Sequence, residues 1–287
     1  DMDMENTNTE RLIDELIRLA FAEDIGDGDH TTLCCIPATE MGRSKLLIKE
    51  AGILAGVEIA KKVFQAFDPE LKMTVYINDG AEVKPGDVAF IVEGKVQSLL
   101  QTERLMLNIM QRMSGIATMT HRYVALLEGL HTRVLDTRKT TPGMRLLEKQ
   151  AVKIGGGVNH RIGLFDMILL KDNHVDFAGG IENAITRCHE YLKEKGKDLK
   201  IEIEVRNLDE LREVMRVGGV DRVMFDNFTP ELTREAVALI DGRFETESSG
   251  GITFETIRSY AEAGVDFVSV GALTHSVKGL DMSFKAC

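Results

Sequence analysis

The stretch from residue 201 to residue 227 reads IEIEVRNLDELREVMRVGGVDRVMFDN, and its pattern is that of a strand, a helix and a second strand. The runs IEIEV (201–205) and RVMFD (222–226) are short and rich in apolar residues, which is typical of strands. Between them, Asn207 with Glu210 three residues later predicts the start of a helix. Two strands joined by a helix indicate a parallel β-sheet.

The same alternation recurs through the second half of the chain. The six candidate strands are RVLD (133–136), MILL (167–170), IEIEV (201–205), RVMFD (222–226), RFETE (243–247) and FVSV (267–270). Helices are expected in the gaps, with Pro142, Pro230 and Thr253 at three of their starts. Repeated units of this kind form either an open doubly wound sheet or a closed barrel. Six strands are fewer than the eight of a complete barrel.

Chemically unusual residues follow these strands at their C-terminal ends. They are Arg138 and Lys139, Lys171, Glu204, Asp226, the run from Ser249 to Gly251, and Gly271. In parallel α/β folds the C-terminal ends of the strands converge on one ligand site. This regular placement favours a barrel with a functional site at one end.

The first part of the chain shows different patterns. Thr7 with Glu10 forms a capping-box pattern, which predicts a helix from there to about Phe21. From residue 45 to residue 96, short β-rich runs alternate with turn sequences, which indicates a compact β-containing unit. A further helix is expected from residue 97 to about residue 128.

Length and composition exclude several classes of protein. The chain has 287 residues, which predicts one or two domains. Its net charge of -11 argues against a nucleic-acid binder, because phosphate neutralisation needs a basic face. No apolar run approaches membrane-spanning length and the start lacks the pattern of a signal peptide, so no membrane association is expected and the expected location is the cytoplasm. The four cysteines show no spacing that fits zinc, and reduced thiols are expected.

A cationic segment stands out in this acidic chain. Between Arg138 and His174 there are seven lysines and arginines against three acidic residues. Arginine suits bidentate contact with a carboxylate and lysine supplies a point charge, so the segment predicts a site for a small ligand with several negative charges. Arg161 follows a triple glycine, and Lys171 follows an apolar run where an unpaired ammonium would be costly. Three other cations recur at helical spacing and are expected to form a solvated face: Arg145, Lys149 and Lys153.

Carboxylates on two strands are candidates for contact with cations or ligand hydroxyls. In IEIEV, Glu202 and Glu204 share one face of the strand, whereas a central parallel strand is normally apolar on both faces. Glu204, nearer the strand end, is the functional candidate, and Glu202 fits a structural ion pair at least as well. Asp226 ends the next strand, where a helix N-cap is the alternative interpretation.

Two glycine-containing loops are candidates for phosphate binding. SSGGIT (248–253) follows one strand and GALTHS (271–276) follows the next. Glycine lets backbone N–H groups approach an anion closely, and a helix N-terminus adds a favourable potential. One such loop is a weak signal, but a pair on the last two βα units is a recurring barrel arrangement. The triple glycine at 155–157 either lets a loop close over a substrate or forms a simple tight turn.

These motifs together resemble the quinolinate phosphoribosyltransferase family. The resemblance runs from about Asp24 to the C-terminus and is carried by DTRKTTPGMRLLEKQAVKIGGGVNHRIGLFDMILLKDNH (136–174), with IEIEV, MFDN, ESSGG and VGALTHS downstream. It implies the type II phosphoribosyltransferase fold, with an N-terminal α/β sandwich (1–116) to which a tail (277–287) returns. The rest (117–276) would form an incomplete TIM-like α/β barrel. It also implies a homodimer.

The family reaction joins quinolinate to 5-phosphoribosyl-1-pyrophosphate and gives nicotinate mononucleotide, pyrophosphate and carbon dioxide, in de novo NAD biosynthesis and with Mg²⁺. The resemblance implies that quinolinate contacts Thr137, Arg138, His160, Arg161 and Lys171, with Arg104 supplied by the neighbouring subunit. It implies that the phosphoribosyl pyrophosphate side comprises Lys139, Lys171, Asp172, Asn173, Glu204, Asp226, Ser249, Gly250, Gly251, Gly271 and His275. Lys139, Glu204 and Asp226 would be catalytic, and the two acids would hold the metal directly or through water.

Three other interpretations stay open. Lys171 at a strand end could form a Schiff base, as in barrel aldolases. A related phosphoribosyltransferase could act on another aromatic acid, although the complete set of carboxylate-binding cations argues against it. A non-catalytic barrel could bind the phosphosugar without releasing carbon dioxide. One departure from the family pattern is Arg206, where an acidic or small polar residue is expected.

Overall fold

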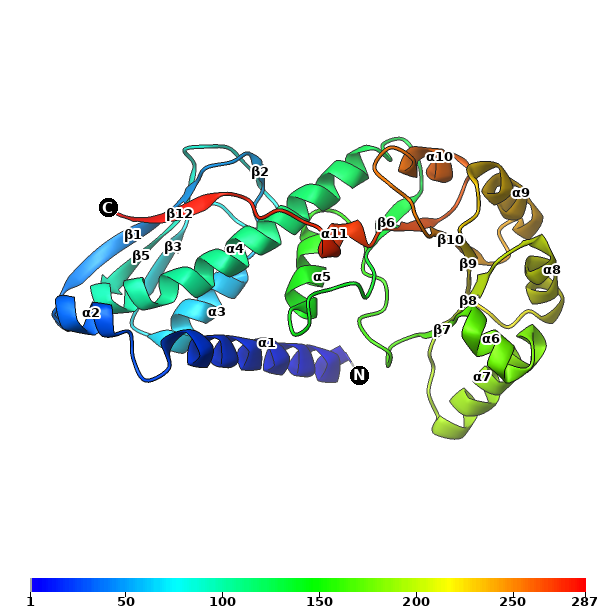
Figure 1. Ribbon diagram of the computed structural model, residues 1–287, viewed down its shortest axis with the longest axis horizontal. Helices are drawn as coiled ribbons and strands as arrows, with labels where there is room; N and C mark the ends of the chain where they lie inside the picture. The colour runs from blue at the N-terminus through cyan, green and yellow to red at the C-terminus, as the bar shows by residue number, and fades with distance from the viewer. Residues whose placement is uncertain (1) are drawn as a thin grey trace. The chain divides into compact units, whose positions relative to one another are not determined.

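The computed structural model describes residues 2–287 (Figure 1). They divide into two compact units that interleave along the chain. The first unit runs to His121 and also contains Thr140–Gly156 and Leu273–Cys287, and the second contains Arg122–Lys139 and Gly157–Ala272. Among the described residues, no helix is both long enough and apolar enough to cross a membrane. All four cysteines are free thiols.

An antiparallel sheet forms the centre of the first unit, with strand order β12-β1-β5-β3. Its strands and those of a small second sheet are β1 (Met41–Ile48), β2 (Gly52–Ile53), β3 (Lys72–Val75), β4 (Glu82–Val83), β5 (Val88–Lys95) and β12 (Met282–Ala286). The helices are α1 (Met2–Ile25), α2 (His30–Cys35), α3 (Val57–Phe67), α4 (Val96–Ala125), α5 (Arg145–Ile154) and α11 (Ala272–His275). α4 ends, and α11 begins, in the second unit.

The C-terminal strand of this unit is held by both hydrogen bonds and side-chain packing. β12 pairs antiparallel with β1, so that Leu46 faces Phe284. The ring of Phe284 packs against those of Phe64 and Phe90, with centroids 6.0 and 6.4 Å away. Buried aromatic rings contribute more than any other side chains to such a core.

A six-stranded parallel sheet forms the second unit, with strand order β6-β11-β10-β9-β8-β7. Its strands are β6 (Arg133–Leu135), β7 (Ile168–Leu170), β8 (Ile201–Val205), β9 (Arg222–Asp226), β10 (Glu245–Ser249) and β11 (Phe267–Ser269). Its helices are α6 (Asp172–Ala178), α7 (Ile181–Lys195), α8 (Leu208–Val217), α9 (Pro230–Ile240) and α10 (Ile257–Glu262). The predicted six parallel strands and the mixed α/β class are confirmed.

The two faces of the parallel sheet differ in polarity. Ile203, Val223 and Phe225 are fully buried on one face, and Figure 1 shows helices α7 to α10 along the outer side of the sheet. The other face carries charged side chains, because Glu202 is in register with Arg222, and Arg222 with Glu245. Parallel strands covered on both sides are normally apolar throughout, so this polar face marks the functional side.

Several element boundaries differ from the sequence-based predictions. Asn207 and Pro230 begin α8 and α9 as predicted. Thr7 lies inside α1 rather than at its start. α5 begins three residues after Pro142. α10 begins four residues after Thr253. β10 begins at Glu245 instead of 243, because Asp241 and Gly242 have left-handed backbone angles that extend the turn after α9.

The predicted solvated face of α5 is wrong at Lys149. Lys153 is exposed, but Lys149 is 1% exposed and Glu148 is fully buried. Glu148 Oε2 lies 3.1 Å from Arg112 Nη2, and Glu148 Oε1 accepts the N–H of Thr141 at 3.0 Å. Helical spacing of charges predicts a shared face but not whether that face meets water.

The triple glycine includes a position where two helices approach closely. A Cβ atom at Gly155 would lie 2.4 Å from the carbonyl oxygen of Ala117, on α4, and 2.9 Å from Thr120 Cβ. Contacts this short with backbone cannot be relieved by rotating a side chain. Gly156 has a positive φ of 99°, so the run also makes a tight turn.

We predict that Gly155→Ala destabilises the protein by about 1–3 kcal/mol, because the added methyl group forces α5 away from α4. The measurement is the midpoint of urea unfolding. Gly279→Ala is the matched control, since a Cβ there meets only ordinary contacts of 3.5 Å or more. Equal midpoints for the two variants would contradict the close approach.

Candidate active site

The predicted site residues of the second unit lie at one edge of the parallel sheet. Arg138 follows β6, Lys171 follows β7, and Gly271 follows β11. Glu204, Asp226 and Ser249 lie in the last two positions of β8, β9 and β10. Because the strands are parallel neighbours, their carboxyl ends form one edge, where ligands bind in α/β folds.

Two arginines lie close together at this edge. Arg161 is partly buried, and burial followed by the positive charge of Arg138 lowers its pKa. The carboxylates of Asp166 and Glu202 act in the opposite direction. A small anion bound beside both guanidinium groups would interact favourably with each of them.

The segment that carries Arg161 is held against β6 by a buried aspartate. Val158 forms a parallel bridge with Leu135, and the fully buried Asp136 accepts the backbone N–H of His160 at 2.7 Å and the side-chain amide of Asn159 at 2.6 Å. Sequence reasoning missed Asp136 as a site residue. Its only signal was a carboxylate at the end of the apolar run RVLD.

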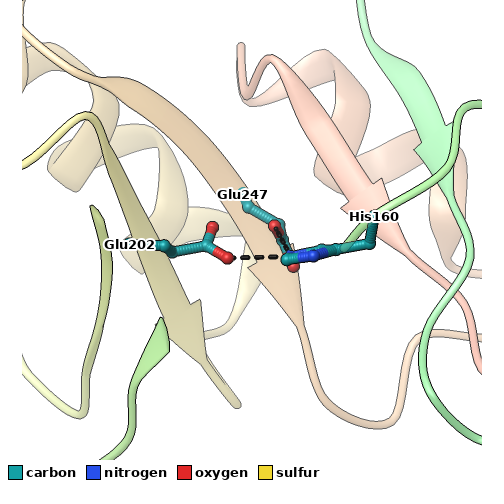
Figure 2. A group of neighbouring side chains, drawn as sticks. All are labelled: His160, Glu202 and Glu247. Atoms are coloured by element: carbon teal, nitrogen blue, oxygen red, sulfur yellow. Dashed lines mark hydrogen bonds and ion pairs between the residues drawn. The ribbon is translucent and has the colours of Figure 1, made fainter. Parts of the chain in front are cut away.

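His160 lies among carboxyl groups on the polar face of the sheet. Its Nε2 is 2.8 Å from Glu202 Oε1 and 3.0 Å from Glu247 Oε1 (Figure 2). Its Nδ1 accepts the backbone N–H of Arg161 at 2.8 Å. The residue is 9% exposed. The side chain of Glu202 pairs with His160 Nε2 and lies 3.8 Å from Arg222 Nε, which fits the structural interpretation of Glu202, whereas contact between His160 and a substrate stays a prediction.

Protonation in this cluster follows from its hydrogen bonds. Burial lowers the pKa of His160, but the hydrogen bonds with Glu202 and Glu247 outweigh burial and raise it to about 9. Burial and the charge of Glu247 raise the pKa of Glu202 to about 8. Because Nδ1 accepts the N–H of Arg161, it carries no proton. A pKa of about 9 for His160 would by itself add a second proton to the ring at neutral pH, but a proton on Nδ1 would remove the acceptor of the Arg161 N–H. The geometry therefore decides in favour of a neutral ring with its proton on Nε2, and the raised pKa of Glu202 places the additional proton there.

The acidic end of the site gathers around Glu204. Burial raises the pKa of Glu204 to about 7, and a hydrogen bond with Asp226 and the charges of Asp226 and Asp172 add to this shift. The N-cap of α9 is Thr229, so the interpretation of Asp226 as an N-cap is wrong. Magnesium binds through one or two carboxylates together with substrate phosphates, and the crowded Glu204 and Asp226 carboxyls fit that donor set.

The lysines of the site are exposed. Lys139 and Lys171 both face solvent, and so does Asn173. The expectation that an ammonium after the apolar run at 167–170 is costly is wrong for Lys171, because Lys171 is exposed at the N-cap of α6. The backbone N–H of Lys171 donates to His174 Nδ1 at 3.0 Å, and that of Lys139 donates to Thr137 Oγ1 at 3.0 Å.

The two glycine loops differ from the predicted geometry in one respect. Gly250 and Gly251 have positive φ values of 95° and 66°, and a Cβ at Gly250 would lie 2.5 Å from Asn227 Oδ1. The next helix, α10, begins only at Ile257. The predicted helix N-terminus next to these glycines is therefore wrong, and no helix terminus adds to the backbone N–H groups of the loop there. Gly271 does directly precede α11.

Two further residues complete the predicted set. Arg104 and His275 belong to the first unit, where both are exposed. Arg104 Nη1 lies 3.5 Å from Asn108 Oδ1 on α4. Arg206, the departure from the family pattern, forms ion pairs with three carboxylates: Glu210 at 2.9 Å, Asp176 at 3.3 Å and Asp172 at 4.0 Å.

Comparison with known proteins agrees with this geometry. Sequence profiles of the quinolinate phosphoribosyl transferase N-terminal and C-terminal domains match residues 29–114 and 116–285. A quinolinate phosphoribosyltransferase [decarboxylating] 1b from Nicotiana tabacum is 45% identical, over 94% of this chain and 81% of its own length. A probable nicotinate-nucleotide pyrophosphorylase [carboxylating] from Bacillus subtilis is 41% identical, over 94% and 91%. The structure of a nicotinate-nucleotide pyrophosphorylase from Francisella tularensis superimposes with a TM-score of 0.90 at 39% identity, over 96% of both chains.

We predict that Glu202→Gln flattens the pH dependence of stability. The folded-state pKa of Glu202 is raised to about 8 from an ordinary value of 4.5, so its contribution is complete below pH about 4.5 and is lost as pH rises through 8. Glutamine cannot ionise. Between pH 5 and 8 the free energy of unfolding of the original protein should therefore fall by on the order of 1 kcal/mol or more relative to that of the variant. The measurement is urea unfolding in buffer without divalent cations, and parallel stability curves would contradict the shift.

Proposed function

We propose how the residues of this chain, which belongs to the quinolinate phosphoribosyltransferase family, carry out that family's reaction. The chain is a decarboxylating phosphoribosyltransferase. It joins quinolinate, a pyridine dicarboxylate, to 5-phosphoribosyl-1-pyrophosphate and forms nicotinate mononucleotide, pyrophosphate and carbon dioxide. The observation that carries the proposal is the pair of neighbouring arginines, Arg138 and Arg161, at the carboxyl edge of the parallel sheet.

In this proposal the quinolinate carboxylates bind the cationic side of the site. Arg138 and Arg161 contact the two carboxylates, because guanidinium groups bind carboxylates through paired hydrogen bonds. The like charges of the two arginines, which oppose each other in the free protein, both become favourable when a dianion binds. Thr137 and Lys171 border the same edge. Binding in this way orients the ring nitrogen toward the ribose, which replaces part of the entropic barrier.

The acidic side of the site receives the sugar phosphate. Glu204 and Asp226 hold ribose hydroxyls and favour the positive charge that develops on the ribose ring as pyrophosphate leaves. The same two carboxyls would hold Mg²⁺, directly or through water, and such a metal would supply charge neutralisation for pyrophosphate. The backbone N–H groups at 249–251, with Asp172, Asn173, Gly271 and His275, border the phosphates.

Decarboxylation then needs no side-chain nucleophile. The ring nitrogen attacks the anomeric carbon as the bond from that carbon to the pyrophosphate oxygen breaks, and the nitrogen becomes positively charged. When carbon dioxide departs, the electron pair of the broken carbon–carbon bond stays on the adjacent ring carbon, where the positive nitrogen stabilises it. A proton then replaces the lost carboxylate. We assign Lys139 to stabilisation of this carbanion-like carbon. Its exposed position beside Arg138 lets the side chain reach a bound ligand, and an ammonium is a mobile point charge.

The experiment that tests the activity is release of carbon dioxide from carboxyl-labelled quinolinate. The purified protein is incubated with phosphoribosyl pyrophosphate and magnesium, and labelled gas is collected. Release that depends on all three components supports the proposed function. Absence of release, with intact folded protein, would refute it. The cytoplasmic location and the absence of nucleic-acid partners stay predictions.

We predict that Arg138→Ala and Arg161→Ala each raise KM for quinolinate by roughly 100-fold, because each removes a charge-assisted contact with a carboxylate. KM for phosphoribosyl pyrophosphate should change far less. Lys153→Ala is the control, since Lys153 is an exposed cation of the same segment. Unchanged quinolinate kinetics in both arginine variants would contradict the assignment.

We propose further that the active form is a homodimer in which Arg104 acts in the neighbouring site. Mixing two inactive variants, Arg104→Ala and Lys139→Ala, then creates mixed dimers with one intact site. Random exchange predicts recovery of about a quarter of the original activity. A mixture of Arg138→Ala and Lys139→Ala should recover nothing. If the first mixture also stays inactive after exchange, Arg104 acts within its own subunit or not at all.

A further inference from the structure

Two fully buried glutamates of the second unit have no role in the reaction described above. Glu202 lies in β8 and Glu247 in β10, on the polar face of the parallel sheet, and both are 0% exposed. They contact the same atom, Nε2 of His160, from two sides (Figure 2). Burial of two carboxyl groups is costly, so their presence calls for a function.

We propose that Glu202 and Glu247 are positioning residues for quinolinate: they orient the ring of His160 so that it fixes the backbone of Arg161. This inference rests on the proposed function, because it assumes that Arg161 contacts the substrate. Both glutamates are fully buried and contact the imidazole ring of His160. Their proposed effect on binding is therefore exerted through His160.

The orientation of the His160 ring is fully determined by its partners. Nε2 must point toward the carboxyl pair, at 2.8 and 3.0 Å. Nδ1 then faces the backbone N–H of Arg161, and the 2.8 Å hydrogen bond between them joins consecutive residues. Without the two carboxyl groups, none of the ring contacts just described would prevent rotation of the imidazole. If the ring rotated, the Arg161 N–H would lose Nδ1 as its acceptor.

A buried arginine holds the two glutamates in place. Arg222, on the intervening strand β9, has Nη1 3.4 Å from Glu247 Oε1 and Nε 3.8 Å from Glu202 Oε2. Its guanidinium also lies over the ring of Phe267, 4.2 Å from the centroid. The charge of Arg222 offsets that of Glu247. Both glutamates are therefore rigidly placed before any substrate arrives.

The neighbouring residue His160 is also anchored through its backbone. Asp136 accepts the N–H of His160 at 2.7 Å, and the ring of His160 accepts the N–H of Arg161. The backbone N–H groups of His160 and Arg161 are thus both held by hydrogen-bond acceptors. An error of about 1 Å in the position of a binding group can lower activity by about 100-fold, so such anchoring has a functional consequence.

A metal site is the competing interpretation of these three side chains. His160, Glu202 and Glu247 offer ligand atoms that all lie within 4.8 Å of one another. The positive charge of Arg222 next to both carboxyls disfavours a cation there. The contacts of Nε2 at 2.8 and 3.0 Å are those of hydrogen bonds. The geometry therefore favours the hydrogen-bonded arrangement.

The test compares three variants by steady-state kinetics with both substrates. Glu202→Leu removes the acceptor while it keeps a side chain of similar size. Glu202→Gln keeps an oxygen acceptor for Nε2. Glu245→Gln is the matched control, because Glu245 contacts the same arginine, at 3.7 Å, but lies on β10 away from His160.

We expect Glu202→Leu to raise KM for quinolinate by about tenfold or more, with a much smaller change in KM for phosphoribosyl pyrophosphate. Glu202→Gln should restore a value close to that of the original protein, and Glu245→Gln should show no change. Equal losses for both substrates in Glu202→Leu, or an unaltered quinolinate KM in folded Glu202→Leu, would overturn the proposal. Absence of carbon dioxide release in the original protein would instead refute the proposed function.

A spectroscopic measurement keeps the inference testable if Glu202→Leu does not fold. The ¹⁵N chemical shifts of the histidine rings distinguish Nδ1 from Nε2 protonation, and comparison with His160→Asn identifies the signals of His160. We expect Nε2 to be protonated and Nδ1 to be unprotonated in the original protein and in Glu202→Gln. A proton on Nδ1 in the original protein would exclude the hydrogen bond to Arg161 and overturn the proposal.

Discussion

The placement of two guanidinium groups, those of Arg138 and Arg161, near each other is the constraint on which the proposed site depends. Both guanidiniums are held at the carboxyl edge of one parallel sheet, one directly after β6 and the other on a segment anchored to β6 by Asp136. An anion bound beside both guanidinium groups would interact favourably with each of them. In the proposed function the fold therefore places both cations for a dicarboxylate before it binds.

The polar face of the parallel sheet supplies the rigidity that this arrangement requires. A sheet with an apolar interior could not fix the backbone next to Arg161 by hydrogen bonds. Here Arg222 and the two glutamates that it contacts form a buried group with balanced charge, and His160 connects that group to Arg161. Farther along the same face, Glu204 and Asp226 form the acidic side of the site. In the proposed mechanism one face of the sheet thus serves both substrates.

The sequence predicted the large features of the molecule and missed some of the contacts. The strand–helix alternation, the number of parallel strands and the side-chain pairing of Glu202 are confirmed. Glu247 was not singled out, because a glutamate in the charged run 243–247 resembles a solvated strand residue until its neighbours are known. Lys149 was placed in solvent because helical spacing does not reveal which face another helix covers. Asp136 was missed because, in the sequence, a carboxylate after an apolar run cannot be distinguished from an ordinary strand end.

The most direct test of the account is a comparison of quinolinate with nicotinate, which has a single carboxylate, by calorimetric titration of the original protein and of Arg161→Ala. If two opposed arginines form a preorganised site for a dianion, the original protein should bind quinolinate at least about 100-fold more tightly than nicotinate. Most of that preference should disappear in Arg161→Ala. Equal affinities for the two acids, or a preference that survives in Arg161→Ala, would contradict the central claim.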